Sequence, residues 1–156
     1  MIWGVRIPEE KMMKELEKIV VFAFEEIINK YDMQSEIISE NEVVLFTDKF
    51  ILSFLYHGNE LQMAYIEKKL DGELYQYNID SFIASSISEE DRMLIKERLQ
   101  NESKVVMELE LLAWVLQKKW EELLLGGKEW VKEYQNFLLY IPERNITKLA
   151  EKYRTI

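Results

Sequence analysis

The sequence predicts an α+β domain: an N-terminal helix, a small antiparallel β-meander over about residues 42–67, and a helical C-terminal half. Apolar residues recur every three or four positions between residues 8 and 31, which indicates the first helix. The period changes to two within the meander and returns to three and four after residue 80. The chain has 156 residues with only five glycines and two prolines, so we expect one domain over residues 1–156 without a flexible linker.

The first helix is expected to run from Pro8 to Tyr31. Pro8 suits the first helical position, and Glu9 follows where the helix dipole favours a negative charge. Phe22 and Phe24 lie off the apolar stripe of this helix. We therefore expect either burial of the helix on more than one side or exposure of one of these rings.

Three alternating runs make up the meander, and two short breaks separate them. Gly58-Asn59 is a strong hairpin signal because both residues accept a positive φ, and Asp48-Lys49 is a weaker one. With loops at these two positions, both hairpins place their apolar residues on the same face of the sheet. The runs are Glu42–Thr47, Phe50–His57 and Glu60–Glu67, and the shared face carries Val43, Leu45, Leu52, Phe54, Tyr56, Leu61, Met63 and Tyr65.

The opposite face of the meander mixes apolar and polar side chains. A solvated face would be more polar, so we expect the protein's own chain to cover part of it. Glu36–Ser39 and Trp3–Ile7 are candidates for additional short strands. Residues 71–80 begin with a turn signal and are expected to form an edge strand or an irregular connection.

The C-terminal half is predicted to be helical throughout. Ser88 and Asp91 have the spacing of a capping box, and Gly126-Gly127 is expected to end a long helix. Trp114 lies away from the core stripe of that helix, where it would contact a second layer or a partner. The helices are expected over Asp80–Ser85, from Ser88 onward, over about Glu102–Leu125, through Trp130–Leu138 and after Asn145.

Composition and motifs exclude several kinds of chemistry. The chain has no cysteine, which excludes disulfides, thiolate nucleophiles and cysteine-ligated metal sites. The only histidine, His57, is placed at a hairpin tip opposite Glu60, and no nucleophile elbow, phosphate loop or calcium loop occurs. We therefore expect no catalytic residue, no cofactor and no metal site.

The net charge of −9 argues against nucleic acid as a partner, because phosphate binding needs clustered Lys and Arg. Residues 1–78 hold 15 acidic and 8 basic residues, so most of the negative charge lies in that half. Neither a signal peptide nor an apolar stretch long enough for a bilayer is visible, which predicts a cytoplasmic protein without a membrane.

One stretch after the meander combines tyrosines with acidic residues. Tyrosine is favoured at protein interfaces, and acidic groups around it would receive a basic partner. The alternative is an edge strand in which these residues have no role in binding. The candidate partner-binding residues are Asp71, Glu73, Tyr75, Tyr77 and Asp80.

The whole profile resembles the immunity proteins of bacterial polymorphic toxin systems. The resemblance lies in the acidic N-terminal half, the Val43–Tyr65 meander, the Tyr-rich acidic connection and the Trp120–Trp130 stretch. These proteins are small, cysteine-poor, often acidic α+β domains that bind and block one cognate toxin. The resemblance implies a binding protein, not an enzyme, that occludes the active site of a basic toxin domain.

Two alternatives stay open. The first is a small enzyme or ligand-binding domain with a pocket between the sheet and the helices. The second is a homodimeric accessory protein that uses the long helix as its contact. A pocket with converging polar groups favours the ligand-binding alternative, whereas a flat acidic surface favours the toxin inhibitor.

Overall fold

The computed structural model describes residues 9–100, 102–153 and 156, with side chains from Glu15 onward. The helices are α1 (Glu9–Ala23), α2 (Glu25–Lys30), α3 (Asp80–Ala84), α4 (Glu89–Arg98), α5 (Lys104–Lys119), α6 (Glu121–Leu124) and α7 (Glu129–Gln135), and a 3₁₀ turn spans Glu151–Tyr153. The strands are β1 (Gln34–Ser39), β2 (Glu42–Phe46), β3 (Phe50–His57), β4 (Glu60–Lys68), β5 (Leu74–Asn78) and β6 (Arg144–Asn145).

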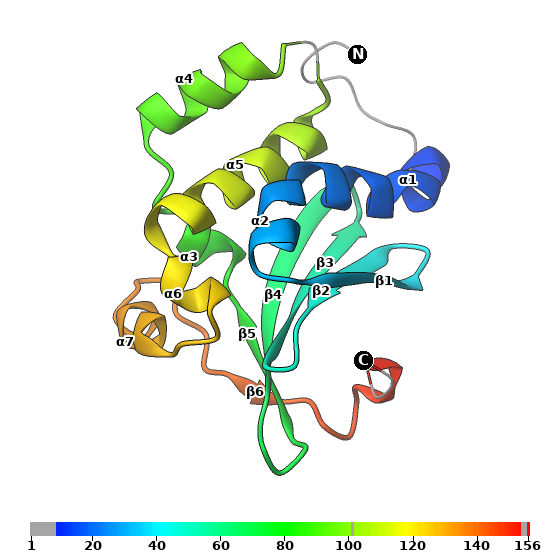
Figure 1. Ribbon diagram of the computed structural model, residues 1–156, viewed down its shortest axis with the longest axis vertical. Coiled ribbons are helices and arrows are strands. Elements are labelled where there is room, and N and C mark those ends of the chain that lie inside the picture. The colour runs from blue at the N-terminus through cyan, green and yellow to red at the C-terminus, as the bar shows by residue number, and fades with distance from the viewer. Residues whose placement is uncertain (1–8, 101, 154–155) are drawn as a thin grey trace.

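The fold is α+β, as the sequence predicts. Within the described residues, six antiparallel strands lie side by side in chain order, and the helices cover one face of the sheet (Figure 1). None of the helices within the described ranges is long and apolar enough to cross a membrane. The expected strand at Trp3–Ile7 and the expected helix start at Pro8 lie outside the described residues.

The predicted register of the meander is confirmed. Leu45 pairs with Leu52 across β2 and β3, and His57 pairs with Glu60 across β3 and β4. Gly58 and Asn59 both have positive φ, at 59° and 68°, which matches the right-handed twist of the strands that they join. Local loop chemistry and period-two alternation are therefore enough to determine this part of the sheet.

The sheet extends beyond the meander on both sides. The candidate strand at Glu36–Ser39 is part of β1, which pairs with β2. Residues 74–78 form β5, but they are not an edge, because β6 pairs with Tyr75 and Gln76. β6 has only two paired residues, too few to produce a visible alternation in the sequence.

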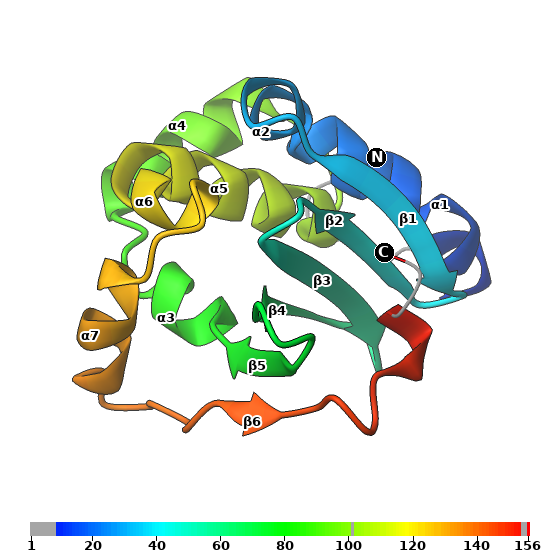
Figure 2. The same cartoon turned by 60° about the horizontal axis from the view of Figure 1, so that its bottom comes forward.

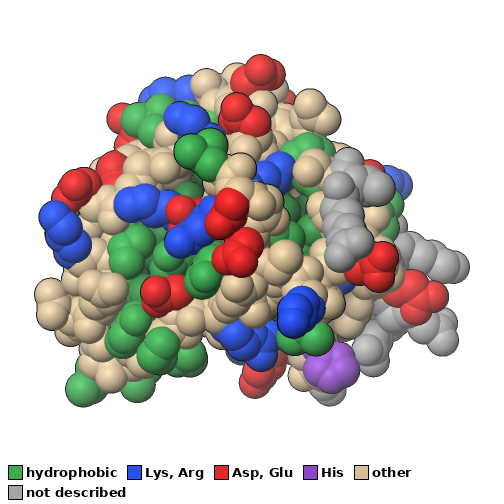
Figure 3. All heavy atoms as spheres, turned by 90° about the horizontal axis from the view of Figure 1, so that it is seen from below, with side chains coloured by type: hydrophobic (Ala, Val, Ile, Leu, Met, Phe, Trp, Pro, Cys, Tyr) green, Lys and Arg blue, Asp and Glu red, His purple; other side chains and the backbone are tan. Residues whose placement is uncertain are grey.

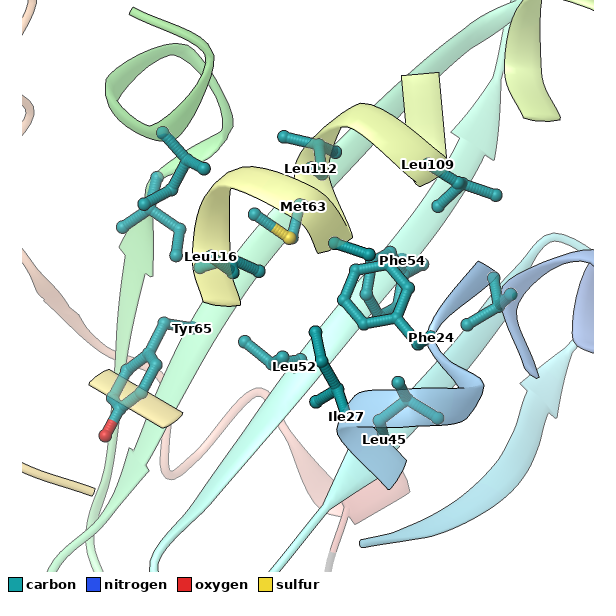
Figure 4. Close-up of a cluster of buried hydrophobic side chains, with 14 of the residues drawn as sticks. Phe24, Ile27, Leu45, Leu52, Phe54, Met63, Tyr65, Leu109, Leu112 and Leu116 are labelled. Atoms are coloured by element: carbon teal, nitrogen blue, oxygen red, sulfur yellow. The ribbon is translucent and has the colours of Figure 1, made fainter. Parts of the chain in front are cut away.

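The main core lies between the helices and the predicted apolar face of the sheet. Figure 4 shows side chains from α2, α5 and the central strands pointing toward one another. The rings of Phe24 and Phe54 meet edge to face with centroids 4.9 Å apart. All of the labelled side chains in this view are buried, and burial of each large apolar side chain contributes about 1.5–3 kcal/mol.

Two predicted helices are each divided into two. The first helix breaks at Phe24, whose buried ring packs on the sheet, whereas Phe22 remains 57% exposed. The long helix breaks at Trp120 (φ −120°, ψ 34°), and the indole of this residue packs 4.9 Å from the ring of Phe82. In both places a buried aromatic side chain occupies the break, so tertiary packing overrides the helical pattern.

The other face of the sheet is partly covered by the chain itself, as expected. The C-terminal segment, defined as residues 141–153, runs along the side opposite to the helices (Figure 2). It contains β6, turns and the 3₁₀ turn in place of the helix expected after Asn145. The apolar contact on this side joins Ile146, Ala150 and Tyr153 to Val44, Ile51 and Ile66.

The predicted capping box begins α4. The Ser88 hydroxyl accepts from the backbone N–H of Asp91, and the Asp91 carboxylate accepts from the backbone N–H of Ser88. The same carboxylate accepts from Trp114 Nε1 and from Lys118 Nζ on α5, each at 2.9 Å. Trp114 therefore contacts a second layer, the helix α4.

Candidate functional site

A groove with a volume of about 450 Å³ lies on the outer face of the sheet, away from the main core. Strands β2 to β5 form its floor, and Lys152, Tyr153 and Ile141 of the C-terminal segment contribute to its walls. The other lining residues are Glu42, Ser53, Leu55, Gln62, Met63, Ala64, Gln76, Asn78 and Asp80.

Strand alternation places polar side chains on the floor. Phe54, Met63 and Tyr77 belong to the main core, so their neighbours along each strand take the opposite face. Pairing brings Ser53, Ala64 and Asn78 into one row across β3, β4 and β5. The small side chain of Ala64 in the middle of this row leaves the floor hollow.

One wall is held by a buried carboxylate. Glu42 is only 3% exposed, and its Oε1 lies 2.6 Å from Lys152 Nζ. Its Oε2 accepts hydrogen bonds from the Ser53 hydroxyl at 2.6 Å and from the Tyr153 hydroxyl. Burial and the hydrogen bond to Glu42 raise the pKa of Tyr153, which keeps the phenol protonated. Glu42 therefore ties the C-terminal segment to the sheet and shapes the groove.

The other end of the groove carries a second carboxylate, Asp80, at the start of α3. Its Oδ1 accepts from the backbone N–H of Ser81 at 3.0 Å. Burial raises the pKa of Asp80, because the half-buried carboxylate is poorly hydrated. Asp80 also lines a smaller pocket of about 260 Å³ together with Glu108. A cation placed beside Asp80 would recover the electrostatic free energy that burial removes.

The five predicted partner-binding residues do not form one surface. Asp71 and Glu73 lie at the β4–β5 turn, and the hydroxyl of half-buried Tyr75 donates to Glu73 Oε2 at 3.2 Å. Tyr77 is only 6% exposed, since alternation along β5 turns its ring into the main core. Asp80, in contrast, lines the groove, and a role of these five residues in partner binding stays a prediction.

Most of the residues that line the groove carry little signal in the sequence. Gln62, Gln76 and Asn78 alternate with buried residues on two neighbouring strands, and that alternation was the available signal. Lys152 and Tyr153 carried no such signal, because they reach Glu42 across more than 100 positions of the chain.

The groove offers hydrogen bonding rather than an evident reaction centre. Its amide side chains both donate and accept, and its carboxylates accept. No group of three or more His, Asp or Glu side chains that could hold a metal ion occurs among the residues that the structure describes. Figure 3, which views the molecule from the side of the C-terminal segment, shows acidic and basic side chains mixed on this face.

Comparison with known proteins adds no further constraint. A scan against protein-family models and searches of curated proteins and of solved structures found no match to this chain.

Proposed function

We propose that this protein is a stoichiometric binding protein that receives a basic segment of a partner protein in the outer-face groove. Its resemblance to immunity proteins makes a toxin domain the expected partner, with neutralisation by occlusion of the toxin's active site. The observation that carries the proposal is a polar groove with the half-buried carboxylate of Asp80 at one end.

The chemistry of the groove fits an extended protein segment. Gln62, Gln76 and Asn78 can pair with backbone N–H and C=O groups of the incoming chain. Asp80 can accept a Lys or Arg side chain from the same segment. The net charge of −9 would accelerate the encounter with a basic partner, an effect that salt weakens.

The experiment is affinity capture followed by titration. Tagged protein is incubated with lysate of its native host, and a retained basic protein is then titrated against the wild type and the Asp80→Asn variant. We expect 1:1 binding that weakens about 30-fold in the variant, the effect of about 2 kcal/mol from a lost, partly buried charge pair. Asp48→Asn, at an exposed turn outside the groove, is the matched control and should bind as the wild type does.

Two results would contradict the proposal. One is a captured partner whose affinity is the same for Asp80→Asn and Asp48→Asn, since the groove would then play no part. The other is the recovery of no basic protein from the host lysate under low-salt conditions.

A small polar ligand is the second candidate. The volume of about 450 Å³ and the converging polar groups are the features that the ligand-binding alternative expects. We rank a small ligand second because binding pockets for small molecules are mostly apolar, whereas amide and carboxylate side chains line much of this groove. A thermal-shift screen of sugars, nucleosides and amino acids separates the two candidates. A compound that raises the melting temperature of the wild type but not of Gln62→Ala would favour the small ligand.

A further inference from the structure

An exposed apolar strip borders the groove. We define this strip as Leu138, Leu139 and Ile141, which are 94%, 61% and 52% exposed. Ile141 also lines the groove, so the strip reaches the groove at this residue. Exposed apolar residues are common singly, whereas a contiguous group of them beside a groove is a candidate interaction site.

The strip is held in place by its inward-facing neighbours. The ring of Phe137 lies 5.6 Å from that of Phe82, and the ring of Tyr140 lies 5.0 Å from that of Tyr134. These two contacts fix which side chains of residues 137–141 point inward. The exposed leucines therefore project from a segment whose backbone is already ordered, which lowers the entropy cost of binding.

One buried hydroxyl fixes the strip relative to the groove. Tyr134 Oη lies 2.9 Å from the backbone oxygen of Asn78 and 3.1 Å from that of Ile141. It also accepts from the backbone N–H of Ile141 at 3.3 Å. Asn78 and Ile141 both line the groove, so Tyr134 sets the distance between the strip and the polar floor.

We propose that the strip is the second half of the partner site and takes apolar side chains that stand beside the basic residue entering the groove. This inference rests on the proposed function. Charge supports this occupant: Lys152 in the groove wall is paired with Glu42, and Asp80 adds a further negative charge to the lining. Glu143 follows two positions after Ile141. A ring of polar groups around an apolar anchor is the usual arrangement of an interface hot spot. The acidic groups would mainly set the association rate, and the strip would mainly set the dissociation rate.

The test is an NMR titration of ¹⁵N-labelled protein with three blocked tetrapeptides. Their sequences are Leu-Leu-Lys-Lys, Ser-Ser-Lys-Lys and Leu-Leu-Gln-Gln. We expect Leu-Leu-Lys-Lys to shift the amide signals of both the groove and the strip. Ser-Ser-Lys-Lys should bind about 10-fold more weakly, the effect of burying roughly one leucine side chain.

Variants of the protein test whether the strip causes the difference in peptide affinity. Leu138→Ser combined with Leu139→Ser should weaken Leu-Leu-Lys-Lys by the same factor and leave Ser-Ser-Lys-Lys unchanged. Leu70→Ser is the matched control, because Leu70 is fully exposed but lies at the β4–β5 turn and does not line the groove. It should not change the binding of any peptide.

The outcomes separate this inference from the proposed function. If both lysine peptides shift the groove with equal affinity, the strip has no role and the groove proposal stands. If only Leu-Leu-Gln-Gln binds, and only at the strip, the basic-segment proposal fails. If no peptide shifts either set of signals, both are overturned. Sedimentation that shows a dimer lost in the double variant would assign the strip to a second copy instead of a partner.

Discussion

Lys152 Nζ lies 2.6 Å from Glu42 Oε1, and this ion pair joins residues 110 positions apart in the chain. Glu42 is buried, whereas the side chain of Lys152 is about half exposed. The pair fixes the C-terminal segment against β2 and thereby forms one wall of the groove.

Removal of Lys152 is expected to cost more stability than removal of both charges. Lys152→Met leaves the buried Glu42 carboxylate without its cation and should lower the free energy of unfolding by about 2 kcal/mol. This loss is smaller than for a fully buried pair because water reaches the Lys152 side chain. Lys152→Met combined with Glu42→Gln should recover about 1 kcal/mol of that loss. Urea unfolding measures both variants. Lys148→Met, on the same segment and exposed, should change stability by less than about 0.5 kcal/mol. A double variant less stable than Lys152→Met would contradict this account of the pair.

Asp91 should make the protein sensitive to acid. Hydrogen bonds from the backbone of Ser88 and from Lys118 and Trp114 hold the pKa of Asp91 well below its usual range. The unfolded carboxyl titrates near pH 4, so the stabilisation is fully present above that pH and is lost as the pH falls below it. Asp91→Asn should lower the free energy of unfolding at pH 7 by about 2 kcal/mol. It should also make the free energy of unfolding less dependent on pH between about pH 4 and about pH 2, which is the acid limb of the stability curve. Urea unfolding across this range measures both effects, with Glu90→Gln as the exposed control. An unchanged acid limb in Asp91→Asn would rule out this role.

Tyr65 should limit stability at alkaline pH. Burial raises the pKa of Tyr65, and its hydroxyl has no hydrogen-bond partner among the described residues. The folded protein keeps this phenol neutral, whereas the unfolded chain ionises it near pH 10. The free energy of unfolding is therefore unaffected by this group below that pH and falls as the pH rises above it. Tyr65→Phe should therefore raise the free energy of unfolding by up to about 1 kcal/mol at pH 7. Above pH 10, the free energy of unfolding of the variant should fall less steeply with pH, by about 1.4 kcal/mol per pH unit.

Tyr77→Phe is the comparison for Tyr65→Phe. Burial also raises the pKa of Tyr77, but its hydroxyl donates to Glu67 Oε1 at 3.3 Å. In this variant too, the free energy of unfolding should fall less steeply with pH above about pH 10. At pH 7 it should be about 1 kcal/mol lower than in the wild type. Urea unfolding from pH 7 to pH 11 measures both, and equal effects of the two variants at pH 7 would contradict the assignment.

Replacement of Asp80 should stabilise the folded protein, whereas the same change is expected to weaken partner binding. Its pKa is raised by burial, so the stabilising contribution of the protonated carboxyl is present below the ordinary carboxyl pKa and is lost as the pH rises. At pH 7 the folded protein therefore carries an unfavourable carboxylate. Asp80→Asn can still accept from the Ser81 N–H and should raise the free energy of unfolding by about 0.5 kcal/mol. Thermal unfolding at pH 7 measures this change, and clear destabilisation would show that Asp80 is structural instead.

Local sequence was sufficient to predict the register of the central strands and the start of one helix. The Gly58-Asn59 loop and period-two alternation determine the register of β3 and β4, because a shift by one residue would turn every apolar side chain to the wrong face. The Ser88–Asp91 spacing likewise predicts the start of α4. These features depend on residues within a few positions of one another.

The groove depends on contacts that no local pattern contains. Its wall requires Lys152 and Tyr153 to meet Glu42, and β6 is a two-residue pairing with β5. The breaks at Phe24 and Trp120 likewise depend on which buried ring has a partner across the core. The sequence by itself determined the α+β class, the register of the meander and the capping box, since each follows from period, loop chemistry or short spacing. Only the tertiary structure decided which polar residues converge in the groove and that Tyr77 is buried, because packing between distant segments sets those positions.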